Sequence, residues 1–268
     1  MKKFACLILV AFFSIAQLFA AERKIALQTY SFSDLPLDEL VPVLKELGID
    51  TLGCSGGLKI SDKYPNVRFN NGMTKEQRDY VKKILKDNNL KIASYGVVYS
   101  KTEKDVENLC KFAREFNCPA IITEDAPSQF PFWEKYCDIY GVKMALHNHA
   151  TNVKNNYYNP EYVHSLIKDY KNIYACADNG HWARSGVDTI KGHNILKGKL
   201  LVIHLKDTNK FGDLSGTCRP FGEGVLNLKE VLKNLDKQGY DSYFVIEYEG
   251  AKNPVEQVKK CVDFLKNN

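Results

Sequence analysis

The sequence predicts a single-domain α/β protein folded as a (β/α)8 TIM barrel. Short apolar segments alternate with amphipathic helical segments eight times, which is the pattern of a closed sheet of parallel strands. The chain has 268 residues, close to the typical size of such a barrel, about 250 residues. The expected strands cover, in order, residues 25–30, 51–54, 91–98, 120–123, 143–147, 173–177, 200–205 and 243–248.

Several of these strands are continuous apolar runs, as expected where a parallel strand is buried on both faces. The helices between them carry start and stop signals. A helix over residues 37–47 ends before a glycine, Thr74 opens a capping box, and Asn159-Pro160 supplies a cap followed by proline. Further helices are expected over residues 102–116 and 227–238 and from residue 254 onward. The competing fold, a doubly wound open sheet, needs a glycine-rich loop after its first strand, and residues 28–32 do not form one.

Residues 1–21 are predicted to be a secretory signal peptide. Lys2 and Lys3 provide a basic start, residues 7–18 an apolar core, and Ala20 a small residue suited to cleavage. The alternative is a membrane anchor, which is disfavoured because the apolar stretch is shorter than the about 20 residues that span a bilayer. The sequence therefore predicts a periplasmic or secreted protein that has no membrane association after cleavage.

The remaining residues, 22–268, are expected to form the barrel domain. The net charge is only +5, and the lysines are spread over helices, which argues against a nucleic-acid partner. Removing Cys6 with the signal leaves seven of the eight cysteines and no Cys-x-x-Cys. An odd number of cysteines in a large domain argues against a disulfide framework, although a single disulfide is compatible with the count. The sequence is also compatible with a homo-oligomer, in which a second copy of the chain is the partner.

Four expected strands end in side chains that bind metals or transfer protons: His147, Asp178, His204 and Glu247, with 31, 26 and 43 residues between neighbours. A parallel barrel brings these strand ends to one mouth. Two imidazoles and two carboxylates suit one divalent ion of Mn, Zn, Co, Fe or Ni, whereas Mg prefers an all-oxygen shell. Each residue alone has a structural explanation, as a hydrogen-bonded histidine or a helix cap.

Catalytic roles follow from the same strand ends. Glu247 is the first choice for a base that removes a proton next to a carbonyl, and His147 is the second proton carrier. Lys206 lies two residues beyond His204 on the same side of the strand, where it could stabilise an enolate or protonate a leaving oxygen. A salt-bridged structural lysine is the alternative.

Four further residues are candidates for binding a sugar: His181, Arg219, His149 and Glu124. His181 and Arg219 could bind hydroxyl or carboxylate groups. His149 could line the site or replace His147 as a metal ligand, because alternate residues of a strand face the same side. Glu124 ends the fourth expected strand and could contact the substrate.

The motifs around these residues resemble the xylose isomerase-like barrels grouped as sugar phosphate isomerases/epimerases, which include ketose 3-epimerases, inosose-processing enzymes and AP endonucleases of the endonuclease IV type. Asp178-Asn-Gly-His181 is similar to that family's Asp-x-x-His motif, and His204-Leu-Lys-Asp to its seventh-strand histidine. Glu247 is similar to its last-strand glutamate. The Gly-x-Gly of residues 219–224 is similar to a family loop preceded by a substrate-binding arginine. The signal would make this chain an exported member.

One position departs from the family pattern. Family members commonly read Ala-Leu-Glu on strand five, and this chain reads Ala145-Leu146-His147. The resemblance implies that the glutamate is both a ligand and one of two proton-transfer bases. Histidine can bind metal and move a proton, but a mechanism with two glutamates does not carry over intact.

The sequence therefore predicts a metal-dependent isomerase or epimerase that forms a metal-stabilised ene-diolate on an unphosphorylated sugar or sugar derivative. The alternatives are a lyase or hydratase acting on 3-keto-glycosides, and a non-catalytic sugar-binding module. Endonuclease activity is disfavoured because its trinuclear cluster needs more strand-end histidines than this chain offers. The chain has six histidines, of which His164 and His193 fall in helical segments.

Overall fold

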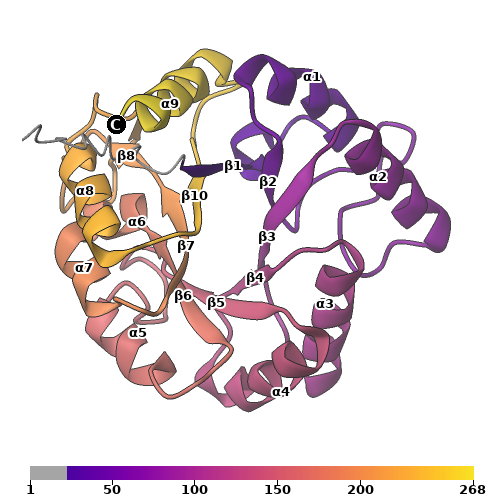
Figure 1. Cartoon of the computed structure of the whole chain (residues 1–268), viewed down its shortest axis with the longest axis horizontal. Coiled ribbons are helices and arrows are strands. Elements are labelled where there is room, and N and C mark those ends of the chain that lie inside the picture. Colours follow the sequence, from indigo (N-terminus) through magenta and orange to yellow (C-terminus); the bar gives the residue numbers. More distant parts are fainter. Residues whose placement is uncertain (1–22) are drawn as a thin grey trace, which may run out of the picture.

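The computed structural model describes residues 23–268. Eight parallel strands close into a barrel in the order β1-β10-β7-β6-β5-β4-β3-β2, and helices surround it (Figure 1). The predicted TIM barrel is confirmed. The barrel strands are β1 (Lys24–Gln28), β2 (Thr51–Cys54), β3 (Lys91–Val98), β4 (Ala120–Thr123), β5 (Lys143–His147), β6 (Ile173–Asp178), β7 (Leu200–Leu205) and β10 (Tyr243–Ile246).

The helices alternate with these strands. They are α1 (Leu37–Leu47), α2 (Lys75–Asp87), α3 (Glu103–Glu115), α4 (Phe130–Tyr140), α5 (Pro160–Ile167), α6 (Asn179–Arg184), α7 (Thr189–Ile195), α8 (Leu228–Gln238) and α9 (Val255–Asn267), with short 3-10 turns η1 (Thr29–Phe32) and η2 (Pro127–Gln129). The expected caps are present: Thr74 forms a capping box with Gln77, and the Asn159 side chain accepts the backbone N–H of Tyr162.

Three features differ from the expectations. The first strand ends at Gln28, where η1 begins, instead of continuing to residue 30. The last strand ends at Ile246: the Glu247 N–H still donates to the Leu205 carbonyl at 3.2 Å, but the N–H of Tyr248 donates to Ser31 Oγ at 2.9 Å. The segment between the expected strand at residues 200–205 and the expected helix at residues 227–238 contains a small antiparallel hairpin, β8 (Asp207–Thr208) with β9 (Cys218–Arg219).

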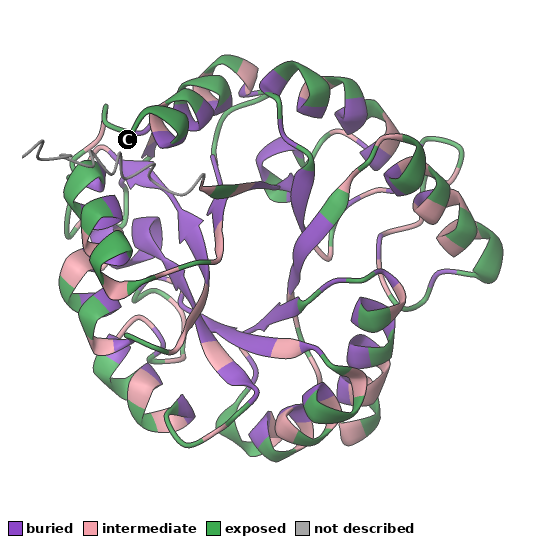
Figure 2. Cartoon of the chain, in the orientation of Figure 1, coloured by how far each residue is buried: buried purple, intermediate pink, exposed green. Residues whose placement is uncertain are grey.

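The core has two layers. The larger layer packs the outer faces of the strands against the helices, and Figure 2 shows buried residues on the strands and on the inward faces of the helices. The inner layer comes from strands alone and consists mainly of small side chains: Ala26, Ala93, Ala120, Ile122, Ala145, Cys176, Val202 and Val245. Four of these precede His147, Asp178, His204 and Glu247 by two residues. The alternation of side chains along a strand therefore aims all four functional candidates into the barrel, one layer above the small residues.

All seven cysteines of the described residues are buried and free. The predicted signal peptide, residues 1–21, lies outside the described residues 23–268. Within residues 23–268, no helix combines the length and the apolar character needed to cross a membrane.

Asn148 joins the functional ends of β5 and β6. Its Oδ1 accepts the backbone N–H of Asp178 at 2.8 Å, and its Nδ2 donates to the Asp178 carbonyl at 3.1 Å. Asn148→Ala should lower the free energy of unfolding by roughly 1–3 kcal/mol, because both backbone groups of Asp178 lose their buried partner. Urea unfolding measures this change. The control Asn156→Ala, at an exposed loop position, should have a free energy of unfolding within about 0.5 kcal/mol of the wild type. Equal stability of the two variants would contradict a stabilising role for the hydrogen bonds between Asn148 and the Asp178 backbone.

Candidate active site

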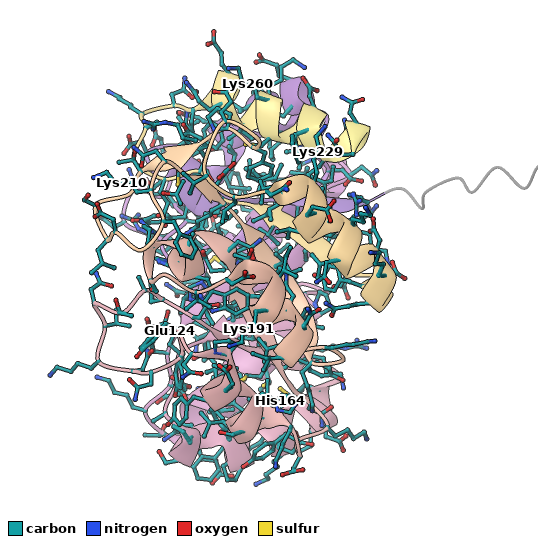
Figure 3. All side chains as sticks on the ribbon, turned by 90° about the vertical axis from the view of Figure 1, so that its left-hand side faces the viewer. Glu124, His164, Lys191, Lys210, Lys229 and Lys260 are labelled. Carbon is teal, nitrogen blue, oxygen red and sulfur yellow. The ribbon has the colours of Figure 1, made fainter. Side chains whose placement is uncertain are left out.

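A cavity of about 280 Å³ opens where the barrel strands end. It is lined by Gln28, Tyr30, Ser55, Gly96, Val97, Tyr99, His147, His149, His181, His204, Lys206, Glu247 and Glu249. A larger cavity of about 550 Å³ includes Lys91 and Tyr243, at the beginnings of β3 and β10, and none of the predicted site residues lines it. Figure 3 shows Glu124 toward the same end of the barrel as Lys210, which belongs to the segment between β8 and β9.

The ends of β6, β7 and β10 bring three of the four predicted metal ligands together. One ligand atom each from Asp178, His204 and Glu247 lies within 4.8 Å of the others. Asp178 and His204 are direct partners in the strand register, and His204 Nδ1 lies 3.0 Å from Glu247 Oε2. His147 adjoins this group, with its Nε2 at 3.5 Å from Asp178 Oδ2.

Several buried atoms of this group make no hydrogen bond within residues 23–268. They are Asp178 Oδ2, both ring nitrogens of His204 and Glu247 Oε2. Buried polar atoms are nearly always hydrogen-bonded, so a group of neighbouring buried donors whose oxygens contact only the Lys206 ammonium group through ion pairs fits a further cation. Two carboxylate oxygens and imidazole nitrogens are donors that a divalent transition metal accepts. The residues present therefore fit the expected cation.

Lys206 supplies a positive charge inside the same group. Its Nζ lies 2.9 Å from Asp178 Oδ2, 3.2 Å from Glu247 Oε2 and 2.9 Å from Glu249 Oε1. Burial lowers the pKa of Lys206, but the three carboxylates outweigh it and raise the pKa well above the usual value. Of these contacts only the one to Glu249 has hydrogen-bond geometry. Glu249 thus holds the ammonium group and leaves the facing oxygens of Asp178 and Glu247 available.

His147 lies between two carboxylates. Its Nδ1 is 2.9 Å from Glu124 Oε1, on the side away from Asp178. Burial lowers the pKa of His147, while Asp178 and Glu124 raise it to about 9. His204 behaves in the same way: burial lowers its pKa, and Cys176 and Glu247 raise it to about 9. A cation would replace a proton on each imidazole that it binds.

Glu124 contacts two histidines, His147 and His149, and is not among the residues that line the cavity. Its Oε1 contacts Nδ1 of both His147 and His149, and its Oε2 accepts from Asn155 Nδ2 at 3.3 Å. Burial raises the pKa of Glu124, but the two histidines lower it well below the usual range. Its predicted contact with substrate therefore has no geometric support, whereas a carboxylate behind a ligating histidine is the usual arrangement in metal sites.

His181 and His149 line the cavity as predicted. His181 lies one helical turn after Asp178, whose Oδ1 caps α6 by accepting the His181 N–H at 2.8 Å. Its ring Nδ1 lies 3.0 Å from an Arg184 nitrogen, so its Nε2 faces Asp178 at 3.9 Å. Burial and the cation of Lys206 lower the pKa of His181 well below 6.5, with Asp178 opposing them. A neutral ring of this kind can bind a hydroxyl group.

Arg219 is not among the residues that line the cavity, so the structure does not bring it together with the other candidate residues. Its guanidinium donates to Thr217 Oγ1 and to the Cys218 carbonyl within the β9 arm. The glycine loop that follows is held by Asp207, whose carboxylate accepts the N–H groups of Gly222, Gly224 and Leu226. A Cβ on Gly224 would lie 2.1 Å from Asp207 Oδ1. These glycines therefore let the backbone wrap a buried carboxylate and do not reach a substrate.

Sequence reasoning missed much of the opposite wall of the cavity. Gln28, Ser55 and Tyr99 come from the ends of β1, β2 and β3, where none of the predicted metal ligands lies. Burial and the nearby Glu124 raise the pKa of Tyr99 to about 12, so its hydroxyl keeps its proton. Position was the available signal for Ser55 and Tyr99, which directly follow the expected strands at residues 51–54 and 91–98, whereas Gln28 lies inside the first expected strand, residues 25–30.

The fold and the histidine–carboxylate group define a TIM barrel with its functional residues at the strand ends. Residues 41–268 match the model of the xylose isomerase-like TIM barrel family, and the chain belongs to this family. An inosose dehydratase of Mesomycoplasma hyopneumoniae is 23% identical over 287 aligned positions, covering 87% of this chain and 89% of that protein. The L-ribulose-5-phosphate 3-epimerase UlaE of Salmonella paratyphi A is 37% identical over 107 residues, 39% of this chain and 36% of that protein.

Solved structures agree with the fold. A protein from Parabacteroides distasonis superposes with a TM-score of 0.74 at 25% identity, over 92% of this chain and 99% of that chain. The 3-keto-D-glucoside 4-epimerase YcjR from E. coli gives a TM-score of 0.71 at 14% identity, over 92% of this chain and 100% of that chain.

His204→Ala should abolish metal retention without unfolding the barrel, because it removes a ligand whose ring makes no hydrogen bond in the described structure. Metal analysis of the purified protein and circular dichroism measure the two properties. His164→Ala, on the outer helix α5, is the matched control and should retain metal normally. Normal occupancy in His204→Ala would remove this residue from the ligand set.

Glu124→Gln should weaken metal binding about 10- to 100-fold, because the amide orients the His147 ring less well and no longer supports its basicity. Competition with a chelating dye measures the affinity. Glu161→Gln, a surface change on α5, should leave the affinity unchanged. If Glu124→Gln binds metal as the wild type does, His147 is either not a ligand or not oriented by Glu124.

Proposed function

We propose that this chain is a divalent-metal-dependent enzyme of the sugar isomerase/epimerase type. It would remove a proton from the carbon next to a carbonyl in an unphosphorylated sugar or sugar derivative. One observation carries the proposal: Asp178, His204 and Glu247 converge from three strand ends with buried atoms that lack hydrogen-bond partners. Relatives named as sugar epimerases and dehydratases support the reaction class.

The cation is one of Mn, Zn, Co, Fe or Ni in this proposal. Asp178, His204 and Glu247 would hold it, with His147 as the fourth ligand. When bound, it supplies Lewis acidity that polarises a carbonyl or hydroxyl oxygen of the substrate. The imidazoles favour a transition metal over Mg, which prefers oxygen ligands throughout.

The chain's own side chains supply the base, the positive charge that balances a developing anion, and a second proton carrier. Glu247 lines the cavity with an oxygen that accepts no hydrogen bond, so it is the base that takes the proton. Lys206 stands 3.2 Å from it with a positive charge fixed by Glu249, where it can balance negative charge that develops on a substrate oxygen. Where Asp178, His204 and Glu247 alone hold the cation, the Nε2 of His147, which faces Asp178 Oδ2 at 3.5 Å, carries the second proton.

A lyase or dehydratase is the second candidate, and the residue on β5 favours it. Symmetric epimerisation needs matched bases on the two faces of the substrate. Here Glu247 faces one side, whereas the other side offers His147 backed by the Glu124 carboxylate. A carboxylate base combined with an imidazole proton donor suits elimination of water or an aglycone from an oxidised glycoside. The inosose dehydratase relative agrees with this outcome.

The proposed location is the periplasm or the exterior, which follows from the predicted signal peptide. Export favours a substrate without a phosphate group. A single sugar ring near the cluster would have His181 within reach for a hydroxyl and His149 at the rim, since both line the cavity.

Exchange of substrate hydrogen for deuterium tests the function. The metal-loaded protein in D₂O, given a panel of ketoses and 3-keto-glycosides, should label the carbon next to the carbonyl. Glu247→Gln should slow labelling by about 10²–10⁴-fold, as expected for loss of a general base. Glu256→Gln on α9 is the control and should label at the wild-type rate.

The products separate the candidates. A rearranged sugar supports the isomerase or epimerase, and loss of water or of an aglycone supports the lyase. Absence of labelling with every sugar, in a protein that retains no metal, would contradict both and leave a sugar-binding module.

A further inference from the structure

The cavity has two chemically different walls. The ends of β5, β6, β7 and β10 carry the imidazoles, carboxylates and Lys206 described above. The ends of β1, β2 and β3 contribute only uncharged groups, among them Gln28, Tyr30 and Tyr99. The charged wall accounts for the proposed chemistry. The uncharged wall has no assigned role in the proposed proton transfer, so its function must lie elsewhere, for example in binding the substrate.

Gln28 has an unused acceptor in this wall. The side chain is buried, with 2% of the residue exposed, yet its Oε1 has no hydrogen-bond partner within residues 23–268. Its Nε2 makes only a long contact of 3.5 Å to the Gly96 carbonyl. An amide that lines a cavity with a free oxygen and a weakly held N–H₂ can accept from one hydroxyl and donate to another. Adjacent hydroxyls of a sugar ring have this combination.

Tyr30 and Tyr99 form the rim of the same wall. They are 53% and 60% exposed, the largest values among the aromatic residues that line the cavity. Exposed aromatic rings at a cavity mouth offer flat apolar surface with a polar tip. The cavity itself measures about 280 Å³, which is below the range of about 300–1,000 Å³ found for drug-sized ligands. A ligand larger than one ring must therefore extend over the two tyrosines.

The charges of the site exclude a phosphate as that extension. Among the described lining residues, Lys206 is the one fixed cation, and it already contacts three carboxylates. Arg184 lies nearby but is engaged by Glu249 and His181. A phosphate group extended over the uncharged wall would find no cationic side chain among the described residues that line that wall.

We propose that Gln28, Tyr30 and Tyr99 form a subsite for an uncharged glycoside. Gln28 binds hydroxyls of the ring that sits beside the charged wall, and the two tyrosines stack on the second ring or the aglycone. That the ring beside the charged wall is the one that reacts rests on the proposed function. The binding pattern itself does not depend on turnover.

Equilibrium binding tests the subsite. The purified full-length mature protein is titrated calorimetrically with glucose, glucose 6-phosphate and the disaccharides cellobiose, maltose and lactose. At least one disaccharide should bind about tenfold more tightly than glucose, the gain expected for stacking on aromatic rings. Glucose 6-phosphate should bind more weakly than glucose.

Single substitutions test which residues produce the higher affinity for the disaccharide. Tyr30→Ala and Tyr99→Ala, at exposed positions that do not support the core, should reduce disaccharide affinity to that of glucose and leave glucose binding within about twofold. Gln28→Leu should weaken both sugars. Tyr162→Ala, at an exposed tyrosine on α5, is the control and should change neither.

The outcomes separate this inference from the proposed function. Equal affinity for glucose and every disaccharide, tight binding of glucose 6-phosphate, absence of sugar binding, or tyrosine variants that bind like the wild type would each overturn the subsite. Deuterium labelling could still succeed in that case. Conversely, the expected binding pattern without labelling of any sugar would keep the subsite and reject the enzyme.

Discussion

The carboxylate of Asp178 is completely buried, and the groups around it balance its charge. Burying an unpaired carboxylate costs several kcal/mol. Lys206 lies 2.9 Å away, His147 3.5 Å away, and the backbone N–H of His181 donates to its other oxygen. Burial raises the pKa of Asp178, but Lys206 and the histidines hold it well below the usual range. The other predicted ligands, and the cavity they line, are arranged around this ionised group.

Close packing of backbone makes this arrangement possible. Gly180 lies in the turn between Asp178 and His181, and a Cβ there would meet the Lys206 side chain at 2.7 Å. The lysine therefore reaches the carboxylates across a residue that has no side chain. The segment 178–181 thus serves three purposes at once: it ends β6, caps α6, and lets the balancing cation approach.

The barrel and the converging strand ends could be predicted because both follow from local periodicity. Side chains two residues apart on a strand face the same side, so a small interior residue such as Ala145 predicts that His147 points inward. Positions were harder to predict where tertiary contacts decide the path of a loop. Arg219 was expected at the substrate because it precedes a glycine motif, but Asp207 draws that motif's N–H groups to itself and the hairpin carries the arginine elsewhere. Gln28 was missed because an amide at a strand end has no distinctive sequence pattern.

The substitution on β5 is best understood together with Glu124. A glutamate at position 147 would set a carboxylate against Glu124, because the present histidine already contacts that oxygen at 2.9 Å. Two buried carboxylates at this distance cannot both stay ionised. Histidine removes the conflict and turns Glu124 into a partner that fixes the ring. The His147–Glu124 pair is therefore one unit, and in the proposed mechanism it supplies an oriented imidazole where a two-glutamate epimerase would have a second carboxylate base. Histidine can still bind a metal, so the change does not remove a ligand. It exchanges a carboxylate for an imidazole as proton carrier, and we therefore expect proton transfer to differ from that of a two-glutamate epimerase.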